Sequence, residues 1–286
     1  MSVVQVRLLG PLEVEVSGIP VELRRKKQRA LIALLALRPG EAISTDRLVE
    51  DLWGQEAPKA AVGSLQNLVS QLRKALGADT LLTRASGYVL DVPAEVVDLH
   101  RFQRLVEEAM ESGAADARAV KLRQALELWR GPALADLAYE PFAQAEIARL
   151  EEMRLGAREE LMDAELELGR HGLVGDLEAL VAEHPLRERL RAQLMTALYR
   201  SGRQADALDA YRQARETLVE ELGIDPSSEL QHLEQAILRH DPGLDLSAPG
   251  EKTAVREADR RKTVTILFTD VVDSTSLGAG LDPEVL

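Results

Sequence analysis

The sequence predicts a mainly α-helical protein in which a small α+β part comes first and an all-α part follows. Residues 3–25, "VVQVRLLGPLEVEVSGIPVELRR", alternate apolar and polar side chains with a period of two, and the alternation breaks at Gly10-Pro11 and at Gly18. This pattern is typical of three short antiparallel strands. From residue 26 onward the periodicity is helical, except for two β-prone runs on either side of "RASG", which predict a hairpin.

Composition limits the classes of protein to which the chain can belong. Its 286 residues, 45% of them hydrophobic, are enough for two domains with real cores. The absence of cysteine excludes disulfides and cysteine-bound zinc, and it is typical of the reducing cytoplasm. The five histidines lack the spacing of metal ligands, so no metal or other cofactor is predicted. No apolar run approaches 20 residues and no signal peptide precedes the strands, so we expect a cytoplasmic protein without a membrane segment.

Charge is unevenly distributed along the chain. The formal net charge of −13 argues against a general nucleic-acid coat. Residues 1–93, however, hold 12 Lys and Arg against 10 Asp and Glu, a net charge of +2, and the remainder holds 23 against 38, a net charge of −15. Only the first third therefore suits DNA, and its cations cluster in "LRRKKQR" (23–29), in "LRK" (72–74) and at Arg84. We expect the acidic remainder to contact proteins.

Three helices and a hairpin follow the strands in the first third. "KKQRALIALLALRPGE" has leucines at helical spacing and a Pro-Gly stop. "STDRLVEDLWG" has acids in its first turns and Ser44 or Thr45 as its N-cap. "PKAAVGSLQNLVSQLRKALG" has Pro58 in its expected first turn and Gly77 just past its end. With the hairpin as a wing, this order predicts a winged helix-turn-helix over residues 1–93.

The third of these helices has one apolar face and one polar face without acids. Its apolar stripe holds Ala61, Leu65, Leu68, Val69, Leu72 and Leu76. Its polar side holds Lys59, Gly63, Gln66, Asn67, Ser70, Arg73 and Lys74. Amide, hydroxyl and cationic side chains suit phosphate oxygens and base edges, so we predict that these residues bind DNA. For this helix considered alone, a merely polar surface is an equal alternative.

These segments together resemble a known family. "ALIALLALRPGEAISTDRLVEDLWG", "LQNLVSQLRKALG" and "TRASGYVLDV" look like the winged helix of OmpR-type response regulators, in particular its form in the SARP family, the antibiotic-regulatory-protein activators of actinobacteria. The resemblance covers residues 3–92 and implies that the third helix lies in the major groove. It also implies that Arg84, at the wing tip, faces the adjacent minor groove or its phosphates. Further candidate phosphate contacts are Arg24, Lys26 and Thr45, although a solvated patch is as good an interpretation of "RRKK".

The middle of the chain shows only helical periodicity. The candidate helices are 98–112, 114–130, 140–170, 173–184, 186–201, 203–222 and 226–239. "LYRSGRQADALDAYRQA" (198–214) has the small-large pattern of a tetratricopeptide helix pair, which is typical of protein-binding arrays. "VDLHRFQRLV", "ALELWRGPALADL" and "EELGIDPSSELQHLEQAIL" resemble the bacterial transcriptional activation domain, which implies that domain over residues 94–241. Its periodicity predicts that it folds alone, with Trp129 and Tyr211 in its core.

The end of the sequence changes character twice. Residues 242–262 are rich in Pro, Gly and charge and are predicted to form a linker. Residues 263–286 begin with "TVTILFTDVVDSTS", which resembles the opening of class III nucleotide cyclase domains. By that resemblance Asp270 is the remnant of a metal-binding carboxylate. Because the rest of such a domain would lie beyond Leu286, we expect no catalytic residues, no bound metal and no enzymatic activity in this chain.

The resemblance implies a function for the whole chain. Members of the SARP family typically bind tandem direct repeats in promoter DNA and contact RNA polymerase there. We therefore predict a sequence-specific transcriptional activator whose partners are promoter DNA, RNA polymerase and further copies of itself on DNA, with no membrane partner. The alternative is the regulatory portion of a larger nucleotide cyclase or ATPase-type regulator. Its support in this sequence is Asp270.

Overall fold

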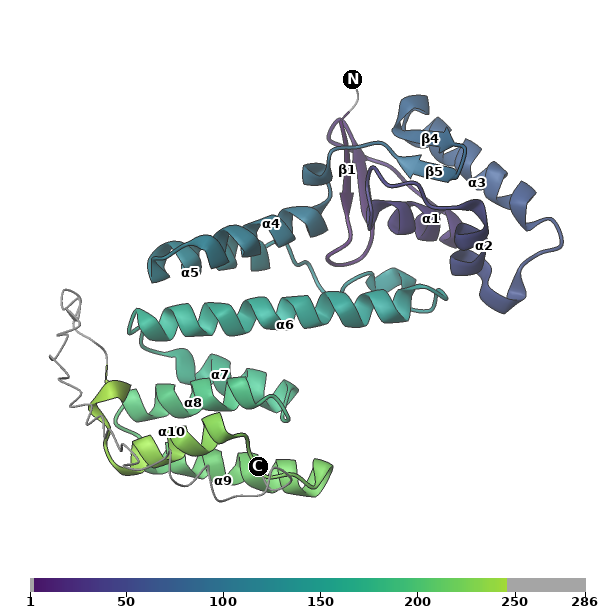
Figure 1. The fold of residues 1–286 in the computed structure, drawn as a ribbon. Helices are drawn as coiled ribbons and strands as arrows, with labels where there is room; N and C mark the ends of the chain where they lie inside the picture. The colour runs from purple at the N-terminus through teal and green to yellow at the C-terminus, as the bar shows by residue number, and fades with distance from the viewer. Residues whose placement is uncertain (1–2, 246–286) are drawn as a thin grey trace, which may run out of the picture. The chain divides into compact units, whose positions relative to one another are not determined.

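The computed structural model describes residues 3–245 and begins with a small antiparallel sheet (Figure 1). Its strands are β1 (Val4–Arg7), β2 (Glu13–Val16) and β3 (Ile19–Pro20), in that order across the sheet. Val6 faces Val14 across the first pair, and both are buried. The period of two therefore arises because one side of each strand packs on the core, and the prediction of three strands is confirmed.

Two helices follow, α1 (Lys26–Ala36) and α2 (Thr45–Trp53). Residues 30–36 of α1 are all buried, because α2, α3 and β5 pack around this helix. Helix α2 is capped by Ser44, whose hydroxyl accepts a hydrogen bond from the Arg47 amide at 3.1 Å. This contact decides between the two N-cap candidates that the sequence offers.

Helix α3 (Ala61–Leu76) begins later than the sequence predicts. Pro58 and Lys59 precede the helix, so the expectation that Pro58 lies in its first turn is wrong. The cause is the backbone at Ala60, which has φ −109° and ψ 44° and leaves the helical region. The predicted end is confirmed at Gly77, whose φ of +106° ends the helix where a side chain would be strained.

The predicted hairpin is present and forms a two-stranded wing beside α3. It consists of β4 (Leu81–Arg84) and β5 (Gly87–Leu90), antiparallel, with Arg84 facing Gly87 at the tip. Strand β5 also contacts α1, and β4 also contacts α3. The two short strands are therefore stabilised by packing against helices, which an isolated hairpin lacks.

The rest of the described chain is helical, as predicted. Its helices are α4 (Asp98–Glu111), α5 (Ala115–Leu126), α6 (Ala143–Glu167), α7 (Leu173–Glu183), α8 (Glu188–Arg200), α9 (Gln204–Leu222) and α10 (Ser228–Leu238). All seven predicted helices occur, but α5 stops at Leu126 instead of continuing to residue 130. The segment 127–142 returns instead to the strands at the start of the chain. Helices α8 and α9 pack as the predicted tetratricopeptide-like pair.

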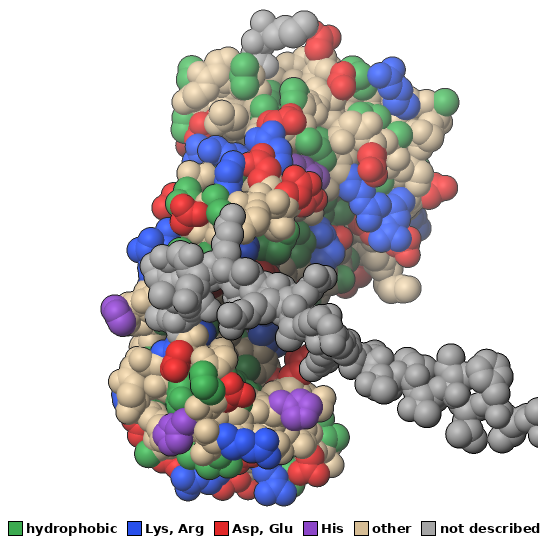
Figure 2. All heavy atoms as spheres, turned by 60° about the vertical axis from the view of Figure 1, so that its left-hand side comes forward, with side chains coloured by type: hydrophobic (Ala, Val, Ile, Leu, Met, Phe, Trp, Pro, Cys, Tyr) green, Lys and Arg blue, Asp and Glu red, His purple; other side chains and the backbone are tan. Residues whose placement is uncertain are grey.

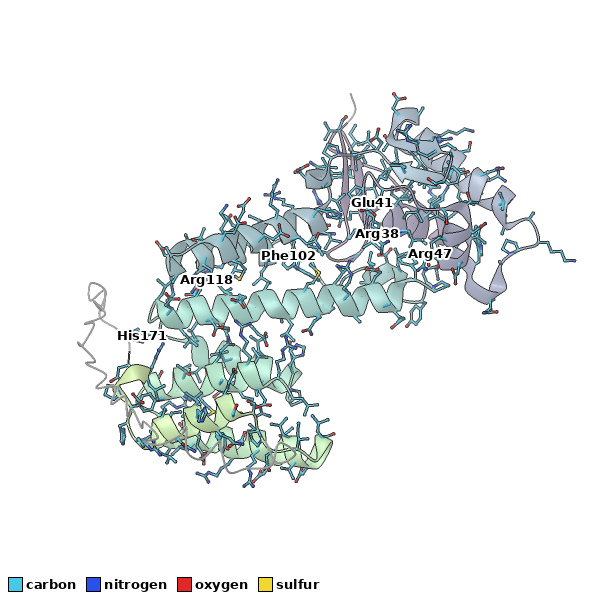
Figure 3. The ribbon with its side chains drawn as sticks, in the orientation of Figure 1. Arg38, Glu41, Arg47, Phe102, Arg118 and His171 are labelled. Carbon is cyan, nitrogen blue, oxygen red and sulfur yellow. The ribbon has the colours of Figure 1, made fainter. Side chains whose placement is uncertain are left out.

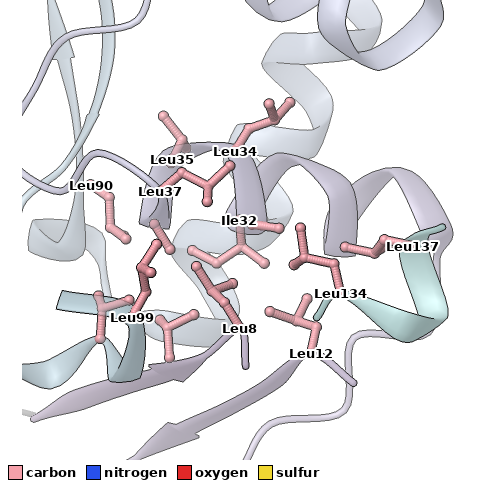
Figure 4. Packing of buried hydrophobic residues seen from close by; sticks show 14 of the residues in the cluster. Leu8, Leu12, Ile32, Leu34, Leu35, Leu37, Leu90, Leu99, Leu134 and Leu137 are labelled. Atoms are coloured by element: carbon pink, nitrogen blue, oxygen red, sulfur yellow. The ribbon is translucent and has the colours of Figure 1, made fainter. Parts of the chain in front are cut away.

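Two hydrophobic clusters form the core of the described residues. The first extends from Val4 to Ala157 and joins the sheet and α1 to α4, α5 and the segment 127–142 (Figure 4). The second joins α6 to α7, α8, α9 and α10. Trp129 lies in the first cluster and Tyr211 in the second, so both predicted core roles are confirmed. Phe102, between α4 and α6 in Figure 3, meets Trp129 edge-on with ring centroids 5.5 Å apart.

Polar contacts across the first cluster hold the turn between β1 and β2. The Asp98 carboxylate accepts hydrogen bonds from the amides of Leu8 and Leu9 at 2.7 and 3.1 Å. The Asp136 carboxylate accepts one from the Leu12 amide at 2.7 Å, and the Arg130 amide donates to the Leu9 carbonyl at 2.8 Å. The first core and its hydrogen bonds therefore continue across the position, near residue 93, where the sequence predicts a domain boundary.

Beyond α10 the structure describes only the first residues of the predicted linker. Pro242–Leu244 form a short 3-10 helix, and the Leu244 carbonyl accepts a hydrogen bond from Arg200 Nε at 2.8 Å. The rest of the linker and residues 263–286, with Asp270, lie outside the described residues. Among residues 3–245 no helix combines the length and the apolar character needed to cross a bilayer.

Candidate nucleic-acid interface

Helix α3 separates its two faces as the sequence predicts. Its buried side holds Leu65, Leu68, Val69, Leu72 and Leu76. Its exposed side holds Gly63, Gln66, Asn67, Ser70 and Lys74. No residue of α3 is acidic, and no side chain forms a capping hydrogen bond at its N-terminus. The exposed face therefore combines amide, hydroxyl and ammonium groups with a gap at Gly63, where no atom lies within 4 Å of an added Cβ.

Two residues near the start of α3 extend this face. Lys59 is exposed, but it lies in the turn before the helix and not on the helix itself. Val62, in the first turn, is 49% exposed although it is apolar. Sequence reasoning missed Val62 because it borders the apolar stripe. In a helix that enters the major groove, a first-turn aliphatic group can contact a thymine methyl.

Arg73 differs from its neighbour Lys74 in where its side chain goes. The Arg73 guanidinium is half-buried and donates to two groups of β4, the Leu81 carbonyl at 2.7 Å and the Thr83 hydroxyl at 2.8 Å. Lys74 is exposed, and its side chain forms no hydrogen bond or ion pair with another of residues 3–245. The two adjacent cations of "LRK" therefore have different surroundings.

The wing brings Arg84 to an exposed position at its tip. Its second strand is fixed by Ile43, because the Ile43 amide donates to the Tyr88 carbonyl at 2.9 Å and the Tyr88 amide donates back at 3.0 Å. A Cβ on Gly87 would lie 1.9 Å from the Ile43 carbonyl oxygen, so this close pairing needs glycine. The glycine of "GY" is thus explained by the close contact between the wing and the segment that leads into α2.

The basic run at 23–29 divides into exposed and engaged cations. Arg24 and Lys26 are exposed, and Arg24 pairs with Glu22 at 3.0 Å. Lys27 pairs instead with Glu140 at 2.7 Å, and Arg29 Nε donates to Asp136 at 2.7 Å. The sequence does not reveal these pairs, because the acids lie more than 100 residues away. Lys27 and Arg29 therefore hold the segment 127–142.

Helix α2 adds polar groups near its N-terminus. Thr45, a predicted phosphate contact, is half-buried at the first position of the helix. Arg47 and Arg38, labelled in Figure 3, are exposed. A hydrogen bond from Arg47 to Asp51 at 2.9 Å raises the pKa of the Arg47 guanidinium above its ordinary value.

Elsewhere the surface mixes both signs of charge. Figure 2 shows Lys and Arg side chains lying beside Asp and Glu side chains over much of one face. In the helical part Arg187 pairs with Glu159 at 2.7 Å and Arg189 with Asp163 at 2.6 Å. Within residues 3–245 no cluster of His, Asp and Glu is arranged to hold a metal ion. The exposed face of α3 differs from these surfaces because it holds no acid.

The helix-turn-helix with a wing shares its core with α4 and α5, and a tetratricopeptide-like helix pair follows in the second core. This arrangement defines the class of winged-helix transcriptional regulators. The comparisons with known proteins agree. Residues 18–90 match the family described as "Transcriptional regulatory protein, C terminal", and residues 97–238 match the "Bacterial transcriptional activator domain". The chain belongs to the SARP family and is a DNA-binding transcriptional activator.

Individual relatives support this assignment. The chain is 45% identical over 260 residues to the regulatory protein DnrI of Streptomyces peucetius, covering 86% of this chain and 96% of DnrI. It is 42% identical to the regulatory protein AfsR of Streptomyces griseus, covering 86% of this chain and 26% of AfsR. The chain thus spans almost all of one relative and about a quarter of the other. Because the relatives are named regulators, an activator is favoured over the regulatory portion of a cyclase.

A solved structure has the same fold. It is Mycobacterium tuberculosis EmbR in complex with a low-affinity phosphopeptide, with a TM-score of 0.82 and 37% sequence identity. The match covers 85% of this chain and 66% of that one. It confirms the predicted fold class, a winged helix followed by a helical part.

Proposed function

We propose that α3 enters the major groove of promoter DNA and reads its sequence. The observation that supports this most is the exposed face of α3, which is long, polar and free of acids in a chain with a net charge of −13. Gln66 and Asn67 lie at its middle, where an amide can pair with an adenine edge. Lys74 lies two turns nearer the C-terminus of α3 and suits a phosphate or a guanine.

Contacts on both sides of α3 complete the proposed interface. Arg84 lies at the wing tip and is proposed to contact the adjacent minor groove or its phosphates. Arg24 and Lys26, exposed at the start of α1, and Thr45, at the start of α2, are proposed phosphate contacts, as is Lys59 before α3. Ser70 and Arg73 complete the predicted set, and the contacts of Arg73 with the wing give it a second role that is argued below.

The helical part is proposed to make the protein contacts of activation. Residues 94–286 carry a net charge of −15, which keeps them away from the phosphate backbone and leaves them free to bind proteins. We propose that several copies bind side by side on direct repeats, and that the helical part contacts RNA polymerase and the neighbouring copy. The domain divisions at 93/94 and at 241/242 are proposed functional boundaries, although the first core crosses the former.

Selection of bound duplexes from a random pool tests the proposal. The expected result is a repeated motif whose copies have the same orientation and recur about every 10.5 base pairs or a multiple of that spacing, so that they share one side of the DNA. Mutation of either copy should weaken binding, and mutation of both should reduce it to the level of random DNA. Failure to enrich any sequence from the pool would contradict sequence-specific binding by this chain.

A further inference from the structure

One cation of α3 is committed to the wing. Arg73 Nε donates to the Leu81 carbonyl and Arg73 Nη2 to the Thr83 hydroxyl, and both acceptors belong to β4. The guanidinium is planar and presents its donors as a rigid fork, so two acceptors from one strand fix both the distance and the direction of that strand. A single side chain of the proposed reading helix therefore sets the place of the wing's first strand.

The opposite edge of the wing is fixed by the segment that leads into α2. Ile43 exchanges two hydrogen bonds with Tyr88 of β5, and the next residue, Ser44, caps α2. Gly87 permits this contact because a Cβ there would overlap the Ile43 carbonyl. The wing is thus held at one edge by α3 through Arg73 and at the other by the start of α2.

We infer that Arg73 is a positioning residue that places the wing relative to α3, so that Asn67 and Arg84 meet DNA in one fixed geometry. This inference rests on the proposed reading of DNA by α3 and the wing. A wing that is already placed loses less conformational freedom on binding, which increases affinity for DNA of matching geometry. Lys74, whose side chain forms no hydrogen bond with another of residues 3–245, is the matched contrast on the same helix.

The first test measures the wing without DNA. Hydrogen–deuterium exchange of residues 81–90 is compared in the full chain and in Arg73→Lys and Thr83→Val, which keep the charge and the shape of the side chains respectively. Both variants should exchange roughly threefold to tenfold faster in this segment, because a charge-assisted hydrogen bond is lost. Thr83→Ser, which keeps the hydroxyl, and Lys74→Ala should exchange like the wild type. Melting curves check that each variant folds. If Arg73→Lys does not fold, the near-isosteric Thr83→Val alone carries the test.

The second test measures binding to the duplex enriched from the random pool. Arg73→Lys and Thr83→Val should each raise Kd by roughly threefold to tenfold while leaving the salt slope unchanged, because no charge is removed. The double variant should bind like Arg73→Lys alone, since the hydrogen bond that Thr83→Val removes is one of the two that Arg73→Lys removes. Arg84→Ala should weaken wild-type binding, but it should have a clearly smaller effect in the Arg73→Lys background, where the wing is no longer placed.

The outcomes separate this role from a direct phosphate contact. If Arg73→Lys binds normally while Arg73→Ala loses about one unit of salt slope, Arg73 contacts phosphate and the inference is wrong. Unchanged exchange of residues 81–90, or an undiminished effect of Arg84→Ala, would also overturn it. If the exchange accelerates but Asn67→Ala and Arg84→Ala bind like the wild type, the tether exists while the proposed reading of DNA fails.

Discussion

At the scale of single residues, the sequence indicates which side chains are exposed on α3 but not which are engaged elsewhere. Helical spacing separates Asn67 and Lys74 from Leu72 because a helix has one period throughout. The same rule gives no sign that Arg73 turns toward β4 or that Lys27 and Arg29 bind Glu140 and Asp136. These pairings depend on segments brought together by the fold, which spacing along one helix cannot show.

Asn67 and Lys74 should contribute to binding in different ways. Asn67→Ala should cost about 1–3 kcal/mol of binding free energy on the selected duplex and little on random DNA, because a base contact carries sequence information. Lys74→Ala should weaken binding to both and reduce the salt slope by about one unit, because a phosphate contact does not. Binding isotherms on both duplexes at several salt concentrations measure this. Wild-type affinity in both variants would mean that α3 does not contact the DNA.

Gly87 should be the glycine whose replacement harms the wing most clearly. Gly87→Ala places a Cβ 1.9 Å from the Ile43 carbonyl oxygen at a φ of +150°, so the pairing of β5 with Ile43 must break. We expect a loss of at least about 2 kcal/mol in the free energy of unfolding. Gly156→Ala, inside α6 and with nothing within 4 Å of the new methyl, should instead gain about 0.5–1 kcal/mol. Urea unfolding compares the two, and equal effects would refute the steric argument.

At the scale of elements, the sequence predicts the type and order of the α-helices and strands in residues 3–245, and it is weakest where an element begins or ends. Helix α3 was expected to include Pro58, yet the backbone at Ala60 delays its start. Helix α5 was expected to reach residue 130, yet it ends at Leu126. The segment beyond it gains more by pairing its amides with Leu8 and Leu9, and that gain comes from tertiary contacts that helical propensity does not contain.

The two faces of α3 should respond differently to mutation. Leu72 is fully buried in the first core, so Leu72→Ala should cost about 2–5 kcal/mol of stability through lost contacts and the cavity left behind. Ser70→Ala, on the exposed face, should change stability by less than about 0.5 kcal/mol. Thermal unfolding of the two variants checks this. A mild effect of Leu72→Ala would indicate that α3 is packed more loosely than its burial suggests.

At the scale of the whole molecule, the first core joins what the sequence divides. The periodicity of 98–241 predicts a helical part that folds alone, and this stays a prediction. The buried residues of the second core, Leu155 to Ile237, do lie within that range. The first core, however, packs Leu99 and Leu134 with Leu8 and Ile32, and these contacts bring together residues between 67 and 126 positions apart (Figure 4). Periodicity shows that a face is apolar but not which partner covers it. The winged helix and α4 to α6 should therefore unfold together.

Asp98 offers a test of this coupling. Its two oxygens accept the amides of Leu8 and Leu9, and in Asp98→Asn one oxygen is replaced by an NH₂ group that cannot accept. One buried amide then loses its partner, so we expect a loss of about 1–3 kcal/mol. Asp176→Asn, exposed on α7, is the matched control. Fluorescence of Trp53, in α2, and of Trp129, in the segment 127–142, should report one and the same unfolding transition, and separate transitions would show that the winged helix and this segment unfold independently.

The wild type and Asp98→Asn should differ in how the free energy of unfolding depends on pH. Burial raises the pKa of Asp98 above its ordinary value, and the amides of Leu8 and Leu9 and the charge of Arg130 only partly oppose this. A raised pKa in the folded state means that folding takes up a proton between the two pKa values. The stability that this carboxyl contributes is then fully present below its unfolded pKa of about 4 and is lost as the pH rises through its folded pKa.

The Asn variant lacks this titration, so its deficit in the free energy of unfolding relative to the wild type should shrink from about pH 4 to pH 7. Urea unfolding of both proteins across that range measures the deficit, and a deficit that grows toward neutral pH would show that the two amides outweigh burial and lower the pKa of Asp98.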